Sequence, residues 1–435
     1  MAGRARRVAG VLPQGTGTVG VWVAASGVLT YLFLATTGRA LGPHESSGLS
    51  TLWVVGFLLG NAAGQPVEQE VARAISSRRA QGLGVGPVVR RAAIASAGFT
   101  AMLVVVILAL GSVLTRKLFG DDWVLLIAFV GLFVGTVAEF LVRGFLAGEA
   151  RFGAYGRLLG AEAASRLVAV VALAIAGVEH AGPYGLVLAL APFIGIAVGL
   201  SRGDRAVLVA PGPPSPWREL TRSLGWLLGA SVFAQALVNL GPVFVRLLSP
   251  RNAALTSAFV ACLIVARVPV FLFQAAQAAL VPRLSHHVGG GQAASLAEET
   301  RALARVLAVL VVVATIGAAA LGPTVVELGW GPGFALGARD FGLLAAGSCV
   351  YLLAVTFGSA LVALECPNRV SYAWASGVVV LALCVVLGDD VLTRVEVGFV
   401  AGAATSALVM GLLVRGPLRR AKAGDPVPDR APRDY

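Results

Sequence analysis

Long apolar runs constrain the fold of this chain more than any other feature of its sequence. Many of the runs are close to the roughly 20 residues that an α-helix needs to cross about 30 Å of hydrocarbon. The strands of a membrane barrel would be about half as long and would alternate in polarity. A 57% share of hydrophobic residues and a mean hydropathy of +0.84 also lie outside the range of soluble domains. We therefore predict an all-α polytopic membrane protein.

The runs predict twelve transmembrane helices in two lobes of six. The N-terminal lobe, 18–200, holds spans at 18–36, 49–64, 92–114, 123–142, 158–178 and 183–200. The C-terminal lobe, 223–414, holds spans at 223–247, 254–280, 306–321, 341–364, 371–387 and 397–414. A polar linker with four arginines and four prolines, 201–222, separates the lobes. Residues 1–17 form a basic N-terminal segment, and the polar tail 415–435 is expected to be disordered.

The distribution of Lys and Arg predicts the orientation in the membrane. With the N-terminus inside the cell, the predicted cytoplasmic segments hold 25 of the 34 basic residues, the outer loops hold six, and three lie within spans. Short cytoplasmic loops are enriched in Lys and Arg, so both termini are expected in the cytoplasm and the protein in the cytoplasmic membrane. The net charge of +12 thus reflects membrane topology and argues against a nucleic-acid partner.

The two lobes repeat one layout. In each, the second span continues into a polar segment that is expected to be amphipathic, 65–79 and 283–305. The fourth spans also match, because each passes a glutamate, Glu149 or Glu365, into a short basic turn before an aromatic-bearing fifth span. Internal repetition of this kind is typical of secondary transporters, in which one lobe moves against the other to give alternating access.

Signatures of enzymes and of nucleotide-driven pumps are missing from the sequence. There is no P-loop, no metal-ligand spacing of Cys and His, and no soluble region long enough for a nucleotide-binding domain. The adjacent His286 and His287 fit a solvated cytoplasmic loop. We predict a protein that is not an enzyme and needs no cofactor. Transport would be driven by an H⁺ or Na⁺ gradient, by the membrane potential, or by another subunit.

Charged residues within the spans are candidates for function, because a charge at mid-bilayer is costly and usually faces a cavity or a partner. Glu139 and Arg143 are four residues apart in the fourth span, and Glu162 and Arg166 are four apart in the fifth. Each pair can neutralise itself on one helix face, or can serve a cavity. Glu139 and Glu162 are therefore candidates for ion coupling.

The eighth span contains the most isolated charge. Arg267 lies roughly 20 Å along a helix that begins near residue 254, with no carboxylate one turn away. We hypothesise that Arg267 and Arg166 line a cationic cavity for an anionic group such as a diphosphate. The alternative is a structural bridge between Arg267 and a glutamate. Pro269 is expected to loosen the helix beside it.

Further polar residues of the seventh span complete the candidate cavity. Gln235 and Asn239 precede the break expected at Gly241 and Pro242. Arg246 is also a candidate, although its place near the outer end of the span favours a side chain that extends to the membrane surface. At the inner end of the second span, Glu68 is a candidate for proton coupling. The alternative is that Glu68 and its neighbour Glu70 are solvated residues that balance nearby arginines.

Three stretches resemble the polysaccharide-type flippases of the multidrug/oligosaccharidyl-lipid/polysaccharide exporter superfamily, in an actinobacterial-like form. The run GPVFVRLLSPRNAALTSAFVACLIVARVPVFLFQAAQAALVPRLS, 241–285, resembles their seventh and eighth helices. The runs GNAAGQPVEQEVARAISSRRA, 60–80, and RGFLAGEARFGAYGRLLGAEAASRL, 143–167, are similar to the inner ends of helices two and four to five. Many relatives carry an acidic residue in helix seven where this chain has 239–242, so the resemblance does not predict ion coupling there.

The resemblance implies a flippase that moves a polyprenyl-diphosphate-linked oligosaccharide or polysaccharide precursor across the membrane. Its partners would be the lipid-linked glycan, the membrane lipids, and glycosyltransferases or a polymerase. Two other functions fit the residues. An ion-coupled drug or metabolite antiporter would have a smaller and more acidic cavity. A scaffold for glycan-assembly enzymes would tolerate neutral residues in place of the intramembrane arginines.

Overall fold

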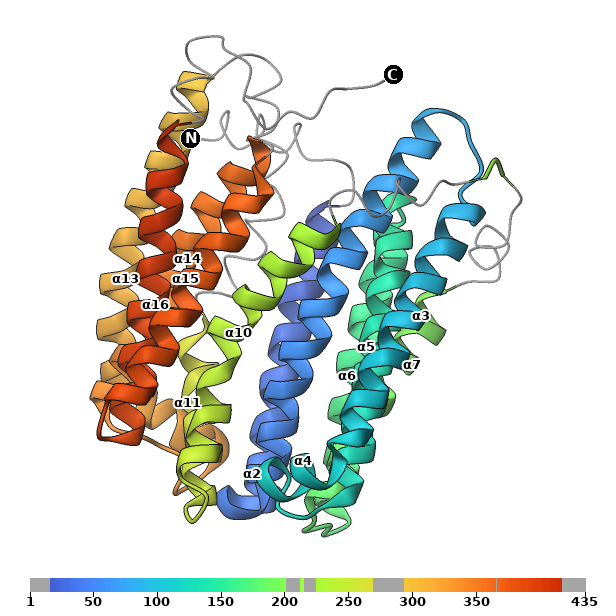
Figure 1. Ribbon diagram of the computed structural model, residues 1–435. Helices are drawn as coiled ribbons and strands as arrows, with labels where there is room; N and C mark the ends of the chain where they lie inside the picture. Colours follow the sequence, from blue (N-terminus) through green and yellow to red (C-terminus); the bar gives the residue numbers. More distant parts are fainter. Residues whose placement is uncertain (1–15, 201–211, 215–223, 269–292, 365, 417–435) are drawn as a thin grey trace, which may run out of the picture. The chain divides into compact units, whose positions relative to one another are not determined.

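The computed structural model describes residues 16–200, 212–214, 224–268, 293–364 and 366–416. Those residues form α-helices joined by short turns, with no strand among them (Figure 1). Ten of the described helices are long and apolar enough to cross a membrane, and a shorter apolar helix joins them. The prediction of an all-α polytopic membrane protein is confirmed.

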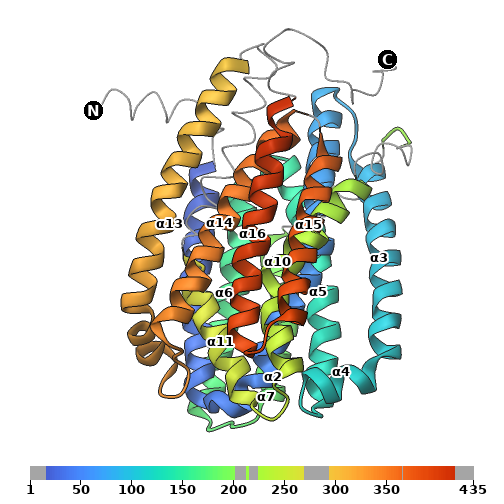
Figure 2. The same cartoon turned by 60° about the vertical axis from the view of Figure 1, so that its left-hand side comes forward.

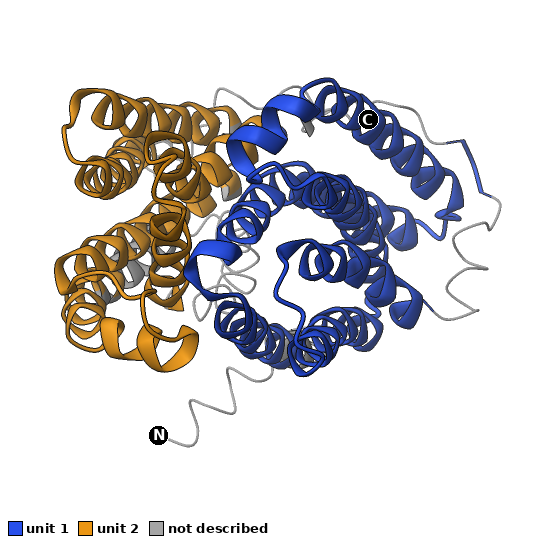
Figure 3. Cartoon of the chain, turned by 90° about the horizontal axis from the view of Figure 1, so that it is seen from below, with its two compact units in different colours: residues 1–228 blue, residues 229–435 orange. Residues whose placement is uncertain are grey.

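The chain divides into two compact units, residues 1–228 and 229–435 (Figure 3). The first unit contains α2 (Thr16–Ala80), α3 (Gly86–Ala109), α4 (Gly111–Leu118), α5 (Trp123–Gly148), α6 (Phe152–Ile175) and α7 (Ala181–Gly199). The second contains most of α10 (Leu224–Leu248), followed by α11 (Ala253–Ala266), α13 (Ala293–Trp330), α14 (Ala338–Ala363), α15 (Pro367–Leu387) and α16 (Val391–Leu413). We describe each unit by itself.

The first two predicted spans are the two arms of α2. A glycine with a positive φ of 71°, Gly42, breaks the helical geometry, and Pro43 begins the second arm. That arm continues to Ala80, so the predicted polar segment 65–79 is a direct extension of the membrane helix. At the far end of the third span, the short α4 follows α3 after one residue (Figure 2).

The eighth and ninth spans differ from their predicted bounds. The helix α11 ends at Ala266, and Arg267 is its C-cap, whereas the prediction carried this helix through Arg267 to residue 280. Val268, which follows the cap, is again helical, so within the described residues the predicted span is interrupted at Arg267. Residues 269–292 lie outside the described part. The ninth span is longer than predicted, because α13 continues through Pro323 to Trp330.

The units share a packing pattern in their last three helices. In the first unit, α5 and α6 both pack against α7. In the second, α14 and α15 both pack against α16. The fourth and fifth spans of each unit therefore contact the sixth in the same way, as expected for two structural repeats.

Apolar side chains cover much of the outside of the helices. Val168, Ile175 and Leu387 are 70%, 82% and 79% exposed. Such residues would be costly in water and are suited to contact with lipid tails. In the first unit, a second apolar layer is buried where one end of α2, α3, α5 and α6 meet. It includes Ile75, Val88, Phe145 and Leu158.

Part of the predicted linker contacts the first unit. Nη1 of Arg78 donates hydrogen bonds to the carbonyl oxygens of Gly84 and Pro213, at 3.1 and 3.0 Å, and Nη2 donates to that of Pro214 at 3.4 Å. The linker thus lies against the end of α2 at residues 212–214. The rest of the predicted linker, the basic segment 1–15 and the tail from 417 onward lie outside the described residues.

Candidate functional site

Four of the predicted site residues belong to one buried polar cluster in the first unit. We call this the α2/α5/α6 cluster. Its members come from three helices that are otherwise largely apolar, and they are Glu68 of α2, Glu139 and Arg143 of α5, and Tyr155, Glu162 and Arg166 of α6.

Arg143 is the residue that ties the three helices together. Its Nη2 lies 3.0 Å from Oε2 of Glu68. Its Nε and Nη2 donate hydrogen bonds to the Tyr155 hydroxyl at 3.0 and 2.7 Å, and that hydroxyl donates to Oε1 of Glu68 at 2.8 Å. Each member of this triad therefore contacts the other two. Charge-assisted hydrogen bonds of this kind are strong in a medium that excludes water.

A glycine on α5, Gly144, allows the helices α2 and α5 to approach each other closely. A Cβ on Gly144 would lie 2.8 Å from the backbone oxygen of Glu68 and 3.0 Å from its Cα. Only glycine leaves room for the backbone of α2 at this point. The close contact of α2 with α5 places Glu68 beside Arg143.

Glu139 is the least well compensated carboxylate of the cluster. It is 4% exposed, and its nearest cation is Nη1 of Arg143 at 3.8 Å. It also interacts electrostatically with Glu162, Arg166 and Glu68. Three carboxylates share two guanidinium groups, so the cluster carries one surplus negative charge when all its groups are ionised. Such a charge in an apolar interior favours uptake of a cation or a proton.

Arg166 forms the second ion pair of the cluster, on α6. It pairs with Oε1 of Glu162 at 3.1 Å, the contact one turn along α6 that the spacing allowed. Its guanidinium lies 5.7 Å from the ring centroid of Trp53 on α2. Its Nε is buried without a hydrogen-bond partner among the described residues. Arg166 thus retains a capacity for one more acceptor.

The expectation that Glu70 balances a nearby arginine is confirmed by its pair with Arg73, but Glu70 is buried and not solvated, with 3% of it exposed. Glu68 is half-buried and pairs with Arg143. Both carboxylates are removed from full solvation because the helix α2 continues past the apolar run and packs on α5. A separate pair between Arg79 and Glu149, at 2.6 Å, joins the ends of α2 and α5.

Three predicted residues of the second unit form one hydrogen-bonded network. Arg267 donates from Nη1 to Oδ1 of Asn239 at 3.0 Å and from Nη2 to the backbone oxygen of Val238. Asn239 in turn donates to Oε1 of Gln235 at 2.9 Å. Tyr351 of α14 interacts electrostatically with Arg267, and its ring lies 5.0 Å from that of Trp374 on α15. The end of α11 and the middle of α10 therefore hold a cationic group that interacts electrostatically with Tyr351 of α14.

Arg246 differs from its predicted surface position. Its side chain is 7% exposed and lies within the protein, and Nη1 has no hydrogen-bond partner among the described residues. The adjacent Val245 is 0% exposed, so this side of the last turn of α10 faces the interior of the unit and takes Arg246 with it.

Sequence reasoning missed a second buried carboxyl in this unit. Glu396, in the second turn of α16, is 0% exposed, and neither carboxylate oxygen accepts a hydrogen bond of good geometry within the described residues. Its interactions are electrostatic, with Asp340 and Arg339 at the start of α14 and with Asp390 before α16. The predicted twelfth span began at residue 397, so Glu396 was placed in a loop. A predicted span that began at Val391 would have included Glu396.

The cysteines and acidic residues show no metal-ligand cluster within the described ranges. All four cysteines are free thiols. The candidate site therefore consists of two charged networks, one in each unit, built from Arg, Glu, Tyr and amide side chains.

Comparison with solved structures shows which class of protein has this fold. The chain is similar to an inward-facing multidrug resistance MATE transporter of the MOP superfamily, with a TM-score of 0.70 and 14% identity over 91% of this chain and 96% of that one. It is also similar to a eukaryotic MATE transporter (TM-score 0.67, 12% identity, 94% and 97% covered) and to a Vibrio cholerae MATE transporter (0.64, 12%, 94% and 98%). The chain thus shares the fold of these MATE transporters along most of its length.

Sequence comparison adds a relative in Mycobacterium tuberculosis. An uncharacterised protein present in two strains is 25% identical over 402 residues, which cover 90% of this chain and 89% of that protein. No protein-family model matches the chain. The fold, the many apolar helices and these likenesses define a multi-pass membrane protein of MATE-like architecture.

Proposed function

We propose that this chain is a membrane transporter that works by alternating access and moves a polyprenyl-diphosphate-linked oligosaccharide between leaflets. The observation that carries the proposal is the fold, which is that of MATE transporters over 91% of the chain. Two units with the same packing of their last three helices suit a mechanism in which one lobe moves against the other. The resemblance of three stretches to polysaccharide-type flippases supports the choice of substrate.

Arginines of the second unit are the groups we propose for the diphosphate. A guanidinium presents parallel N–H groups that match phosphate oxygens, and its charge does not titrate. Asn239 and the Val238 carbonyl fix the orientation of Arg267, so little side-chain entropy would be lost on binding. The neighbouring Tyr351 and Trp374 rings offer a surface for the sugar or the first isoprene units.

Coupling to an ion gradient is assigned in this proposal to the α2/α5/α6 cluster. The surplus carboxylate, centred on Glu139, would bind H⁺ or Na⁺ when access is from one side and release it on the other. Glu68 and Glu162 would share the charge through Arg143 and Arg166. The cluster joins α2, α5 and α6, so a change in its charge would alter how these helices pack.

Transport assays in reconstituted vesicles test the identity of the substrate. We would measure translocation of a fluorescent polyprenyl-diphosphate oligosaccharide under an imposed pH gradient, Na⁺ gradient or membrane potential, for the wild type, Arg267→Ala and Arg267→Lys. We expect Arg267→Ala to lose at least about tenfold in rate, from one charge-assisted contact, and Arg267→Lys to recover part of it. Arg116→Ala is the control, because Arg116 is exposed and bonds only its own helix.

The outcomes separate the alternatives. No translocation of the lipid-linked glycan by the wild type under any gradient would overturn the proposed substrate. Efflux of organic cations in the same vesicles would then favour the drug antiporter. Full transport by a folded Arg267→Ala protein would assign Arg267 a structural role only.

A further inference from the structure

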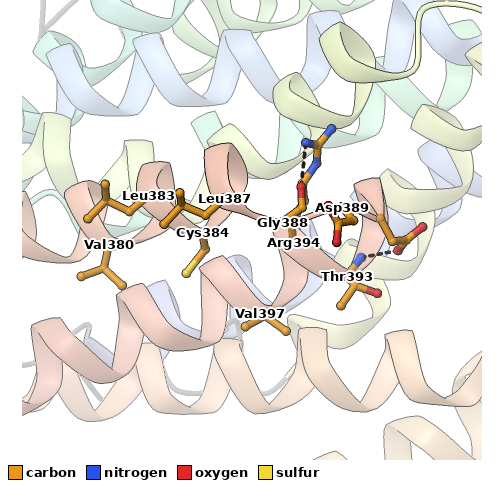
Figure 4. Close-up of a pocket in the computed structure, with 10 residues that line it drawn as sticks. Val380, Leu383, Cys384, Leu387, Gly388, Asp389, Thr393, Arg394 and Val397 are labelled. Atoms are coloured by element: carbon orange, nitrogen blue, oxygen red, sulfur yellow. Dashed lines mark hydrogen bonds between the residues drawn. The ribbon is translucent and has the colours of Figure 1, made fainter.

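A groove on the outside of the second unit is not used by the proposed transport mechanism. It lies between α15 and α16 near the turn that joins them, and its volume is about 500 Å³ (Figure 4). That volume is within the range of small-molecule sites, roughly 300–1,000 Å³. The groove is lined by Val380, Leu383, Cys384, Leu387, Gly388, Asp389, Asp390, Thr393, Arg394 and Val397.

One end of the groove is hydrocarbon. Leu383, Leu387 and Val397 line it and are 53%, 79% and 41% exposed. Their positions on helices long and apolar enough to span the membrane place them where lipid tails are the surrounding solvent. From Val380 to Leu387 the apolar strip is roughly 10 Å long at 1.5 Å per residue. A segment of an acyl chain fits both the polarity and the length.

The other end of the groove is charged. Two carboxylates, Asp389 and Asp390, follow Gly388 at the end of the apolar strip, and Arg394 lies one turn into α16. The backbone N–H of Thr393 donates to Asp390 at 2.8 Å and holds the pKa of that carboxyl below its usual range, so it is ionised at neutral pH. Arg394 donates from Nη1 to the Gly388 carbonyl at 3.2 Å, and its Nε has no hydrogen-bond partner among the described residues.

Close packing of the two helices shapes the groove. A Cβ on Gly398 would lie 2.9 Å from a Leu381 methyl and 3.1 Å from the Cys384 Cβ, and one on Gly388 would lie 2.4 Å from the Cβ of Arg394. The helices therefore meet through glycines beneath the groove, while the larger residues on either side form its walls. The groove is built into the α15/α16 pair and does not depend on another part of the chain.

We propose that this groove binds one membrane phospholipid with an amine-bearing headgroup, with an acyl chain along the apolar strip and the headgroup at the charged end. Arg394 would contact the phosphate, and Asp389 would contact the ammonium group. The three charged residues sum to one negative charge, which disfavours a purely anionic headgroup and favours one that carries a positive group next to its phosphate. This lipid site is distinct from the proposed sites for the transported substrate and the coupling ion.

Native mass spectrometry of the full chain tests the proposal. The delipidated protein would be titrated with phosphatidylethanolamine, phosphatidylcholine and phosphatidylglycerol that have the same acyl chains. We expect phosphatidylethanolamine to be retained over phosphatidylglycerol by a factor on the order of three, as for one exposed ion pair. Asp389→Asn removes the exposed carboxylate without touching the Asp390 cap, and we expect it to abolish this preference.

A matched pair of leucines tests the acyl end. Leu383→Trp fills the groove and should reduce retention of all three lipids, whereas Leu328→Trp changes a leucine that is 70% exposed on α13, outside the groove, and should leave retention unchanged. Melting temperatures of both variants would show that they are folded; if Leu383→Trp is not, the Asp389→Asn preference decides. Three results would each overturn the proposal. The wild type could retain the three lipids equally, or the two tryptophan substitutions could have equal effects on lipid retention. The third result is a protein that forms a dimer without bound lipid.

Discussion

The hydroxyl of Tyr155 on α6 accepts two hydrogen bonds from Arg143 on α5, at 3.0 Å from Nε and 2.7 Å from Nη2. The same hydroxyl donates to Glu68 on α2. One phenol oxygen thereby joins three helices through a charged pair. Since the pair is half-buried, the loss of this oxygen would leave donors and acceptors of the pair without a protein partner.

Tyr155→Phe is expected to lower the free energy of unfolding by about 1–2 kcal/mol, because it leaves two N–H groups of Arg143 and one oxygen of Glu68 short of a partner. Thermal melting of the purified protein in detergent measures the effect. Tyr184→Phe is the control, because the Tyr184 hydroxyl makes a single bond to the neutral Val178 carbonyl at 2.9 Å. Equal shifts for the two variants would contradict a special role for the triad.

Gly144→Ala is expected to destabilise the first unit by about 1–3 kcal/mol, because the new methyl would meet the backbone of Glu68 and force α2 away from α5. Gly98→Ala in α3 is the matched control. No atom lies within 4 Å of the Cβ position at Gly98, so alanine there should be neutral or stabilise the helix by about 0.5–1 kcal/mol. The melting temperatures of the two variants should shift in opposite directions, or the shift for Gly144→Ala should be clearly larger.

Glu139→Gln is expected to keep the protein folded and to remove the response of transport to an imposed ion gradient. The amide has the shape of the carboxyl but cannot gain or lose a proton, and it removes the surplus charge of the cluster. Initial rates in vesicles, with and without a gradient, measure the response. Glu149→Gln removes a carboxylate from the pair with the half-exposed Arg79 and should leave the response intact. A normal gradient response in Glu139→Gln would exclude Glu139 as the coupling group.

Glu396→Gln is expected to stabilise the second unit relative to the wild type, and increasingly so toward alkaline pH. An ionised carboxyl in an apolar interior costs free energy that a neutral amide does not. The pH at which the wild type begins to lose stability would be read from melting temperatures over a pH series. The exposed Glu179→Gln serves as the control and should show no such trend. A Glu396→Gln protein less stable than the wild type at every pH would show instead that the carboxylate is stabilised by its neighbours.

Much of the candidate site could be predicted because local spacing decides it. Arg166 and Glu162 are one turn apart on α6, so their pairing at 3.1 Å follows from helix geometry alone. The positions of Glu68 and Glu396 within helices could not be predicted from spacing. Their burial depends on how far α2 and α16 extend beyond the apolar window and on which helix covers them there.

The hydrogen-bond partner of Arg267 could not be predicted from the sequence either. Arg267 caps α11, but the amide that it contacts, Asn239, lies 28 residues away along the chain. Only the packing of α10 against the end of α11 brings that amide to the guanidinium. The alternative of a glutamate bridge could not be decided by spacing.

Long apolar runs are enough to define this chain as a bundle of membrane helices with a repeated layout, because such runs leave the backbone no other way to satisfy its hydrogen bonds in lipid. They also place Glu139, Glu162 and Arg166 within helices. The tertiary structure decided which of those charges meet, since contacts between helices depend on close approaches such as that at Gly144 and on the lengths of the helices outside the hydrocarbon. For that reason the α2/α5/α6 cluster, the Arg267 network and the groove at Arg394 emerge only from the folded units.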